Sequence, residues 1–252
     1  MNVGARVLYQ AIVPHYARIR DQLAADIACG RFLAGEKLPP ERDLAARFGC
    51  TRVTLRQALQ QLETEGLIYR ENRIGWFLCP PRIHYDPTRL VSFMDYVRLQ
   101  GREPLTECLS AERRRAGSWL AARMNLASAD EPVFQLHRRR LIDGRPVLVE
   151  INTLLARWCP DLLDARLDCS LTTLLRERFG KVQTRCSLSL RLGTVNEEQA
   201  ELLQLGAGAS NLVLERLNYA EDDLLVEFDQ EFWRPDAVAV AVAVAVEAQY
   251  PS

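Results

Sequence analysis

The stretch at residues 38–78, LPPERDLAARFGCTRVTLRQALQQLETEGLIYRENRIGWFL, decides the fold of the first part of the chain. Pro40 can open a helix but cannot continue one, and the two acidic residues that follow suit the positive end of the helix dipole. Gly49 supplies a turn, and Thr51 is a good N-cap for a second helix that ends near Gly66. The pattern predicts a helix, a tight turn and a second helix.

The second helix has one apolar stripe and one polar surface. Its apolar side chains recur at helical spacing, and we expect this stripe to face a core: Leu55, Ala58, Leu59 and Leu62. Arg52, Thr54 and Arg56 surround its N-terminal end, as in a helix that reads the major groove of DNA. Residues 67–70 and 76–78 alternate like the strands of a wing. Spacing alone leaves open a helical subdomain whose arginines are only a solvated surface.

Several motifs of this region resemble the GntR family of bacterial transcription regulators over residues 10–80. They are Tyr16, Gly30, Gly35, LPPERDLA, TRVTLRQAL, LETEGLI, Gly75 and Phe77. The resemblance implies a winged helix-turn-helix whose DNA contacts are Arg42, Thr51, Arg52, Thr54 and Arg56, with Arg73 and Gly75 in the wing. The wing departs from the usual family form, since Arg73 stands where a glycine is usual and Trp76 where a threonine is usual.

Charge and cysteine content restrict the class of protein. The net charge is −1, and residues 1–80 carry 11 Lys plus Arg against 8 Asp plus Glu, so only the first part is mildly basic. Such a charge suits a small DNA footprint, doubled in a homodimer, rather than unselective coating. Seven cysteines occur without CxxC spacing, so we expect neither a disulfide framework nor a metal site. We find no signal peptide or membrane-spanning run and expect a cytoplasmic protein without a cofactor.

A proline-rich segment separates two expected domains of the chain. We expect a DNA-binding domain at residues 1–78, a semi-rigid proline-rich connector at 79–88 and an effector-binding domain at 89–252. The second domain opens with a helix expected at 89–101. Strands outnumber helices after it and most links are short, which predicts an α+β fold with a largely antiparallel sheet and helices on one side.

The most informative segment of the second domain is a hairpin around Asp143 and Gly144. Arg138 and Arg140 lie two residues apart, so on a strand they share one face and favour a doubly charged anion. Glu150 on the return strand lies opposite Arg138 if the loop has three residues, which we expect, and opposite His137 if it has two. From spacing alone, the two arginines fit surface ion pairs as well as they fit a ligand site.

Caps and alternation predict the remaining elements. A serine is expected to cap a helix at Ser118 and at Ser170, and Thr194 with Glu197 to form a capping box. Strands are expected at 105–111, 183–193, 211–219, 224–233 and in the closing run VAVAVAVAVE at 238–247. The strict alternation of that last run predicts a strand packed on both sides.

The second domain resembles the UTRA effector domain over about residues 85–246, through RRLIDGRP, Glu150 six residues after Gly144, Ser170 at a helix start, and EFDQEFWRPDA. That domain defines the HutC branch of the GntR family and has a chorismate-lyase-like fold. The resemblance implies effector contacts at Ser92, Phe93, Arg138, Arg140, Glu150, Ser170, Glu227 and Trp233. For an aminophosphonate, Arg138, Arg140 and Ser170 suit the phosphonate, and Glu150 or Glu227 the ammonium.

Within that branch, RENRIGWFLCPPR, YDPT, LQGREP and FWRPDA most resemble regulators of phosphonate utilisation that respond to 2-aminoethylphosphonate. We therefore expect a ligand-responsive homodimeric repressor that binds double-stranded operator DNA at an inverted repeat. Three alternatives remain: a regulator that responds to a sugar phosphate or another small metabolite, a chorismate-lyase-like enzyme, and a DNA-binding protein that ignores small molecules. The enzyme is disfavoured because the three histidines form no triad-like context and no phosphate-binding glycine loop occurs.

Overall fold

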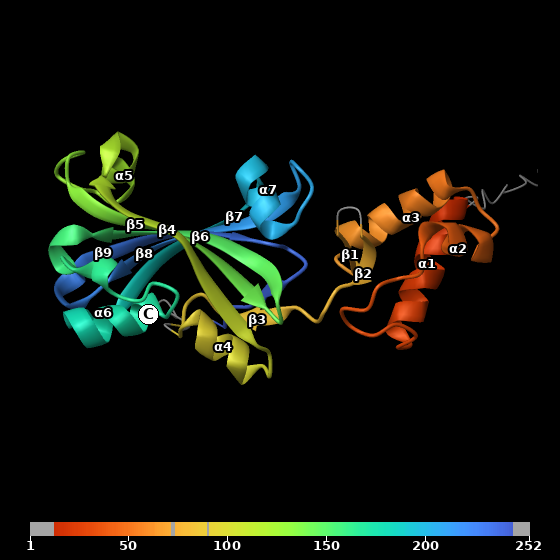
Figure 1. Ribbon diagram of the computed structural model, residues 1–252, viewed down its shortest axis with the longest axis horizontal. Helices are drawn as coiled ribbons and strands as arrows, with labels where there is room; N and C mark the ends of the chain where they lie inside the picture. Colours follow the sequence, from red (N-terminus) through yellow and green to blue (C-terminus); the bar gives the residue numbers. More distant parts are fainter. Residues whose placement is uncertain (1–12, 72–73, 90, 244–252) are drawn as a thin grey trace, which may run out of the picture. The chain divides into compact units, whose positions relative to one another are not determined.

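The computed structural model describes residues 13–71, 74–89 and 91–243 (Figure 1). The chain divides into two compact units, Met1–Pro81 and Arg82–Ser252. The division falls inside the proline-rich segment expected as a connector at 79–88. Part of that segment is not a connector, because Ile83–Tyr85 form strand β3 of the second unit.

The described part of the first unit contains three helices: α1 (His15–Ala28), α2 (Glu41–Arg47) and α3 (Arg52–Thr64). The last two lie where the sequence predicts a helix, a turn and a second helix. The Oγ1 atom of Thr51 accepts a hydrogen bond from the backbone N–H of Thr54 (3.2 Å), which caps α3. The left-handed conformations of Gly49 and Gly66 follow α2 and α3, and glycine adopts them without steric cost.

The wing is an antiparallel pair of strands, β1 (Ile68–Glu71) and β2 (Gly75–Leu78). Both strands lie within one residue of the boundaries that alternation predicts. Gly75 has a φ of 139°, a conformation that side-chain-bearing residues rarely adopt, and this explains a glycine at the start of β2. The wing residue Arg73 lies outside the described residues.

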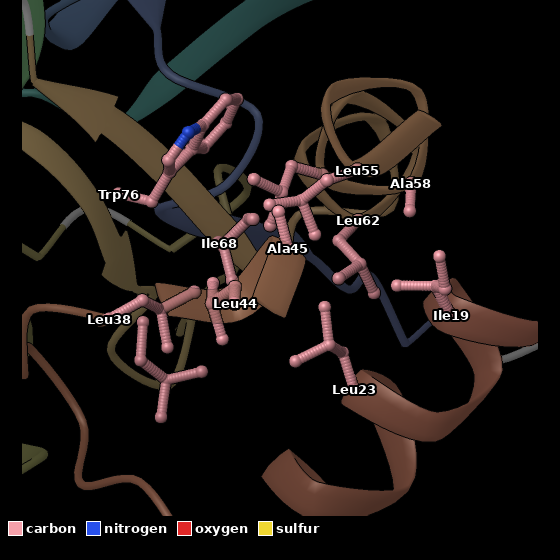
Figure 2. Packing of buried hydrophobic residues seen from close by; sticks show 12 residues of the cluster. Ile19, Leu23, Leu38, Leu44, Ala45, Leu55, Ala58, Leu62, Ile68 and Trp76 are labelled. Carbon is pink, nitrogen blue, oxygen red and sulfur yellow. The ribbon is translucent and has the colours of Figure 1, made fainter. Parts of the chain in front are cut away.

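The core of the first unit confirms the apolar stripe expected on α3. Leu55, Ala58, Leu59 and Leu62 are fully buried. Figure 2 shows Ile19 and Leu23 directed from α1 toward the side chains of α3, with Trp76 at the edge of the cluster. Burial of these side chains fixes α3 against α1 and leaves its N-terminal polar end exposed.

A six-stranded antiparallel sheet in the order β4-β5-β6-β9-β8-β7 forms the second unit. Its strands are β4 (Pro104–Arg115), β5 (Pro132–Ile142), β6 (Arg145–Leu155), β7 (Arg185–Thr194), β8 (Ser210–Tyr219) and β9 (Leu225–Trp233). Single 3₁₀ turns occur at Ala156–Trp158, Leu162–Asp164 and Glu221–Asp223. The α+β class with a largely antiparallel sheet is confirmed.

Helices cover both faces of this sheet, so the expectation of helices on one side is wrong. α4 (Phe93–Leu99) and α6 (Leu171–Phe179) lie on one face, and α5 (Gly117–Arg123) and α7 (Glu197–Leu203) lie on the other (Figure 1). Short links next to alternating strands do not specify the face to which a helix returns, because both faces of this sheet carry apolar side chains. The pocket described below lies on the α4 and α6 face.

Three local boundaries differ from the sequence-based expectation. α5 begins one residue before Ser118, with Ala116 at its N-cap position. The capping box of α7 is formed by Asn196 and Gln199 instead of Thr194 and Glu197, because Asn196 Oδ1 accepts from the Gln199 N–H at 2.8 Å. The helix expected at 89–101 is shorter, since Ser92 caps α4.

The hairpin of β5 and β6 pairs Arg138 with Glu150, as expected, by a different route. Ile142 pairs with Arg145, so the loop contains only Asp143 and Gly144. A β-bulge next to Arg140 then shifts the register by one residue. The expected three-residue loop is wrong, but the bulge produces the same pairing of Arg138 with Glu150.

The closing alternating run forms a much shorter strand than its pattern predicts. β10 (Val238–Val240) pairs in parallel with β3, and residues 241–243 are exposed and irregular. The remainder of the run lies outside the described residues. Alternation of valine and alanine shows compatibility with a strand, but a neighbouring strand must be available along its whole length.

Truncation of Leu62 to alanine should destabilise the first unit by about 2–5 kcal/mol, because the buried side chain leaves a cavity between α1 and α3. Denaturant unfolding followed by circular dichroism measures the change. Val53→Ala on the same helix is the control, since Val53 is 68% exposed. Equal midpoints for the two variants would contradict the assigned core.

Candidate functional site

The N-terminal end of α3 presents the polar side chains expected to contact DNA. Thr51 and Thr54 lie together, with their hydroxyl oxygens 3.0 Å apart. Arg52 is exposed, and within residues 13–71, 74–89 and 91–243 it has no hydrogen-bond or ion-pair partner. Val53 beside it is exposed as well. The guanidinium of Arg52 is therefore available to an external acceptor.

The other two arginines of this surface form exposed ion pairs. Arg42 Nε donates to Asp43 Oδ1 (3.1 Å), and Arg56 Nε donates to Glu41 Oε2 (2.8 Å). Both side chains stay more than half exposed, so these pairs contribute little stability and leave the guanidiniums accessible to another acceptor. The surface thus carries three accessible arginines around the start of α3.

A small polar cavity lies in the second unit. It encloses about 60 Å³ and all eight residues expected to contact an effector line it: Ser92, Phe93, Arg138, Arg140, Glu150, Ser170, Glu227 and Trp233. They come from α4, β5, β6, β9 and the start of α6. The structure therefore brings together residues that are up to 141 positions apart in sequence.

One end of the cavity is built around the Glu150 carboxylate. Arg138 Nη2 forms an ion pair with it, and Arg140 contacts it from Nε (2.9 Å to Oε2) and Nη2 (2.8 Å to Oε1). Arg138 and Glu150 are only 1% and 2% exposed. The alternative of surface ion pairs for the two arginines is therefore wrong. Two guanidiniums and one carboxylate leave this end with a charge of +1.

Neighbouring groups fix both guanidiniums in place. Arg138 Nε donates to Asn152 Oδ1 (2.9 Å), and its Nη1 donates to the carbonyl of Cys169 (2.8 Å). Arg140 donates to Thr106 Oγ1 (3.1 Å) and lies over the ring of Phe93, 4.8 Å from its centroid. Because their partners surround them, these arginines are held rigidly beside the cavity.

The N-terminus of α6 also borders the cavity at this end. Ser170 Oγ accepts from the backbone N–H of Thr173 (3.2 Å), and Leu171 and Thr172 line the cavity. The positive end of a helix dipole favours an anion there. The Ser170 cap is the helix start that the sequence predicts.

A second set of charged groups in the cavity is acidic and lies beside the first, because Glu150 on β6 pairs with Glu231 on β9. Glu227, Asp229 and Glu231 alternate along β9 and face the cavity together. Amide groups satisfy the first two: Asn152 Nδ2 donates to Asp229 (2.9 Å), and Asn218 Nδ2 donates to Glu227 (2.9 Å). Three carboxyl groups thus converge where the cavity meets β8 and β9.

Arg216 and two aromatic residues enclose Glu231. Arg216 Nη2 lies 3.1 Å from Glu231 Oε1, and Trp233 Nε1 donates to Glu231 Oε2 (2.6 Å). Tyr85 of β3 hydrogen-bonds to both Glu231 and Arg216 through its hydroxyl. The first strand of the second unit therefore reaches directly into the cavity.

Burial and charge give the two ends different proton affinities. Burial raises the pKa of Asp229 well above its usual range, and the neighbouring carboxylates of Glu231 and Glu150 raise it further. Burial also raises the pKa of Glu227. At Glu150 burial acts in the same direction, but Arg138 and Arg140 outweigh it and lower the pKa. Glu150 stays ionised, whereas Asp229 favours its protonated form.

Sequence reasoning missed several residues of this cavity, among them Tyr85, Asn152, Arg216, Asn218, Asp229 and Glu231. The acidic alternation in EFDQE at 227–231 was the available signal for two of them, since alternate strand positions share a face. Asn152 follows Glu150 by two residues on β6, so the same rule applies to it. Arg216 and Asn218 depend on the register of β8 against β9, and Tyr85 lies on β3, whose partner β10 is distant in sequence.

Comparison with known proteins identifies the family. A model described as bacterial regulatory proteins, gntR family, matches residues 15–78, and the UTRA domain model matches residues 99–239, which is more than half of the chain. The chain belongs to the GntR family and carries a UTRA domain. The resemblance to the GntR family and to the UTRA domain is thereby confirmed over the matched residues, and the family is one of ligand-responsive transcription regulators.

Two relatives of this UTRA-domain regulator match it over most of its length, and a third matches its second unit. The HTH-type transcriptional repressor NagR of Bacillus subtilis is 26% identical over 228 residues, which cover 90% of this chain and 93% of that protein. The crystal structure of PhnF from Mycobacterium smegmatis has 26% identity and a TM-score of 0.65, and covers 91% of this chain and 100% of that one. The effector domain of PhnF, at 24% identity and a TM-score of 0.60, covers 65% and 100%.

Within the described ranges, no group of three or more His, Cys, Asp or Glu side chains has a geometry for a metal ion. In the same ranges no helix combines the length and apolar character needed to cross a bilayer.

Asp229→Asn should stabilise the protein at neutral pH by on the order of 1 kcal/mol. Because the pKa of Asp229 is raised in the folded protein, the stability contributed by its protonated carboxyl is fully present below the pKa of the unfolded chain. That stability is lost as the pH rises through the folded-state pKa. The neutral amide removes this loss and still accepts from Asn152. Unfolding at a series of pH values measures the effect, which should shrink toward pH 4. If the variant were less stable than the wild type by an amount that grows with pH, the raised pKa of Asp229 would be contradicted.

Proposed function

We propose that this regulator is a homodimeric repressor of phosphonate-utilisation genes whose effector is 2-aminoethylphosphonate or a closely related small phosphonate. The observation that carries the proposal is that one small cavity is lined both by the guanidiniums of Arg138 and Arg140 and by the carboxyl groups of Glu227 and Asp229. The motif resemblance at residues 70–82 and 232–237 favours the same effector class.

An anionic phosphonate fits the cationic end. The net charge of +1 left by Arg138, Arg140 and Glu150, together with the N-terminus of α6, favours an anion beside Ser170. The arginines already hold Glu150, so the ligand adds to this cluster rather than replacing the carboxylate. Removal of Glu150 would leave two buried guanidiniums without their partner.

An ammonium group fits beside the carboxyl groups of β9. The hydrogen bonds of the cavity favour Glu227 and Asp229 over Glu150 as its partners. Both oxygens of Glu150 contact guanidiniums. In contrast, Asn218 Oδ1 is buried and receives no hydrogen bond from the described residues, which makes it an open acceptor beside the acidic group. An ammonium placed there ionises Asp229 by favouring its charged form.

The size of the cavity favours a small effector. A volume of about 60 Å³ holds roughly four to six water-sized groups. A phosphonate with a two-carbon spacer and an amine is of this order, whereas a hexose phosphate is about twice as large and requires the cavity to open. The sugar-phosphate alternative is therefore less compatible with the described cavity than the aminophosphonate.

DNA recognition is assigned to the start of α3 and to the wing. Arg52 and Arg56 are proposed to bind base edges in the major groove, Arg42, Thr51 and Thr54 to bind phosphates or support the arginines, and Arg73 with Gly75 to follow the adjacent backbone. Two copies in a homodimer bind an inverted repeat, because each recognition helix reads one half-site. NagR, a related protein, is a repressor.

Arg52→Ala should weaken specific binding to a selected operator at least about 10-fold and leave the melting temperature unchanged. Arg52 is exposed, and its side chain forms no hydrogen bond or ion pair with the described residues, so its truncation costs little stability. Fluorescence anisotropy with duplexes selected from a random library measures the affinity. The control is Arg176→Ala, an exposed arginine on α6 of the second unit. Unchanged operator affinity would contradict the assigned reading surface.

Titration with three small ligands tests the effector. 2-Aminoethylphosphonate at a hundred times its Kd should stabilise the protein by about 2.7 kcal/mol, as measured by thermal unfolding. Ethylphosphonate lacks the amine and ethanolamine lacks the phosphonate, so each should bind at least about 10-fold more weakly than the zwitterion. An equal thermal shift with ethylphosphonate would show that the carboxyl groups of β9 do not contribute to ligand binding. A thermal shift only with a hexose 6-phosphate would favour a regulator that responds to a sugar phosphate. The absence of a shift with every ligand would favour a DNA-binding protein that ignores small molecules.

A further inference from the structure

The Glu41 carboxylate joins the wing to the recognition helix. Its Oε2 accepts from Arg56 Nε on α3 (2.8 Å), and its Oε1 accepts from the indole Nε1 of Trp76 on β2 (3.2 Å). Each carboxylate oxygen thus has one donor, and the two donors come from different elements. Glu41 itself is the first residue of α2.

The contact with Glu41 leaves the DNA-facing part of Arg56 open. Only Nε of Arg56 is engaged, and among the described residues Nη1 and Nη2 have no hydrogen-bond acceptor. Those two groups form the fork that binds the O6 and N7 atoms of guanine. A partner at Nε therefore orients the guanidinium plane without occupying the groups that read a base.

Trp76 is a fixed point for this arrangement. It is 5% exposed, belongs to the core cluster of the first unit, and stands at the edge of that cluster in Figure 2. Arg70 on the paired strand lies over its ring, 5.8 Å from the centroid. Because the indole cannot change position without disturbing the core, its N–H defines where the Glu41 carboxylate lies.

The arrangement faces solvent on the side of Arg56. Glu41, Arg56 and Trp76 line a groove of about 300 Å³ together with the cationic side chains of Lys37 and Arg70. Burial raises the pKa of Glu41, but hydrogen bonds from Trp76 and Arg56 outweigh it and lower the pKa, so the carboxylate stays ionised at neutral pH. The cations around the groove suit the approach of a phosphate backbone.

We propose that Trp76 and Glu41 are positioning residues for base recognition: Trp76 holds the Glu41 carboxylate, and Glu41 holds the Arg56 guanidinium at one defined base pair of each half-site. The inference rests on the proposed DNA-reading function and adds a specificity element to it. It also gives a role to the tryptophan that stands where the family usually has a threonine, since an indole N–H extends farther from the backbone than a hydroxyl.

The physical basis is the geometry required for bidentate recognition. Both Nη groups must lie in the plane of the base at hydrogen-bonding distance, and a freely rotating side chain satisfies this only part of the time. Loss of the support at Nε should reduce discrimination at the base pair read by Arg56. It should leave discrimination by Arg52 unchanged, because Arg52 makes no contact with Glu41 or Trp76 in the structure.

Selection of random duplexes by the full-length protein, followed by sequencing, tests the proposal. Arg56→Ala first identifies the base pair whose preference depends on Arg56. Trp76→Phe keeps an aromatic ring but removes the N–H, and Glu41→Gln keeps the shape but removes the charge. Both variants should lose at least about 5-fold discrimination at that same base pair while the remaining positions keep their preference.

Matched controls separate positioning from general weakening. Trp158→Phe removes an indole hydrogen bond to the Leu225 carbonyl in the second unit, and Glu65→Gln removes a pair with Arg20 at the other end of α3. Neither should change the selected sequence. Wild-type preferences in both Trp76→Phe and Glu41→Gln, or equal losses at every position, would overturn the inference, as would an Arg56→Ala variant with unchanged preferences. If the wild-type protein selects no sequence, the proposed DNA-reading function itself fails.

Discussion

The buried carboxylate of Glu150, shared by Arg138 and Arg140, is the interaction on which the effector domain depends. Charges removed from water are tolerated only when they are paired, so the three side chains must meet on the same face of neighbouring strands. The two-residue turn of the β5–β6 hairpin alone would place Glu150 opposite His137. The bulge next to Arg140 corrects the register and creates the cationic end of the cavity.

The acidic end arises from the alternation of β9 and from the position of that strand in the middle of the sheet. β9 lies between β6 and β8, so its inward carboxyl groups receive amide donors from both sides, Asn152 on one and Asn218 on the other. Tyr85 contributes a hydroxyl from β3, the strand that begins the second unit. The cavity therefore includes a hydrogen bond from the first strand of the second unit.

Local signals in the sequence predict the parts of the molecule that depend on nearby residues. The caps at Thr51 and Ser170, the apolar stripe of α3 and the sharing of a face by Arg138 and Arg140 are of this kind. The register of β8 against β9 is not, although the two strands are consecutive, because it depends on an irregularity next to Asn218 that no local signal marks. The pairing of β9 with β6 joins segments that are far apart in sequence. The alternating run after residue 237 was misjudged for the same reason, since its pattern does not supply a partner strand.

Each unit contains an arginine held by a glutamate, and burial determines what each pair can do. Arg56 is exposed beside Glu41, so water and salt weaken the pair and DNA can add contacts to the free end of the guanidinium. Arg138 beside Glu150 is sealed from water, and separation of that pair would leave an uncompensated buried charge. Arg56 can accordingly extend its contacts while it keeps Glu41. The pocket arginines have to keep theirs, and a ligand can act only on the charge that remains after they are paired.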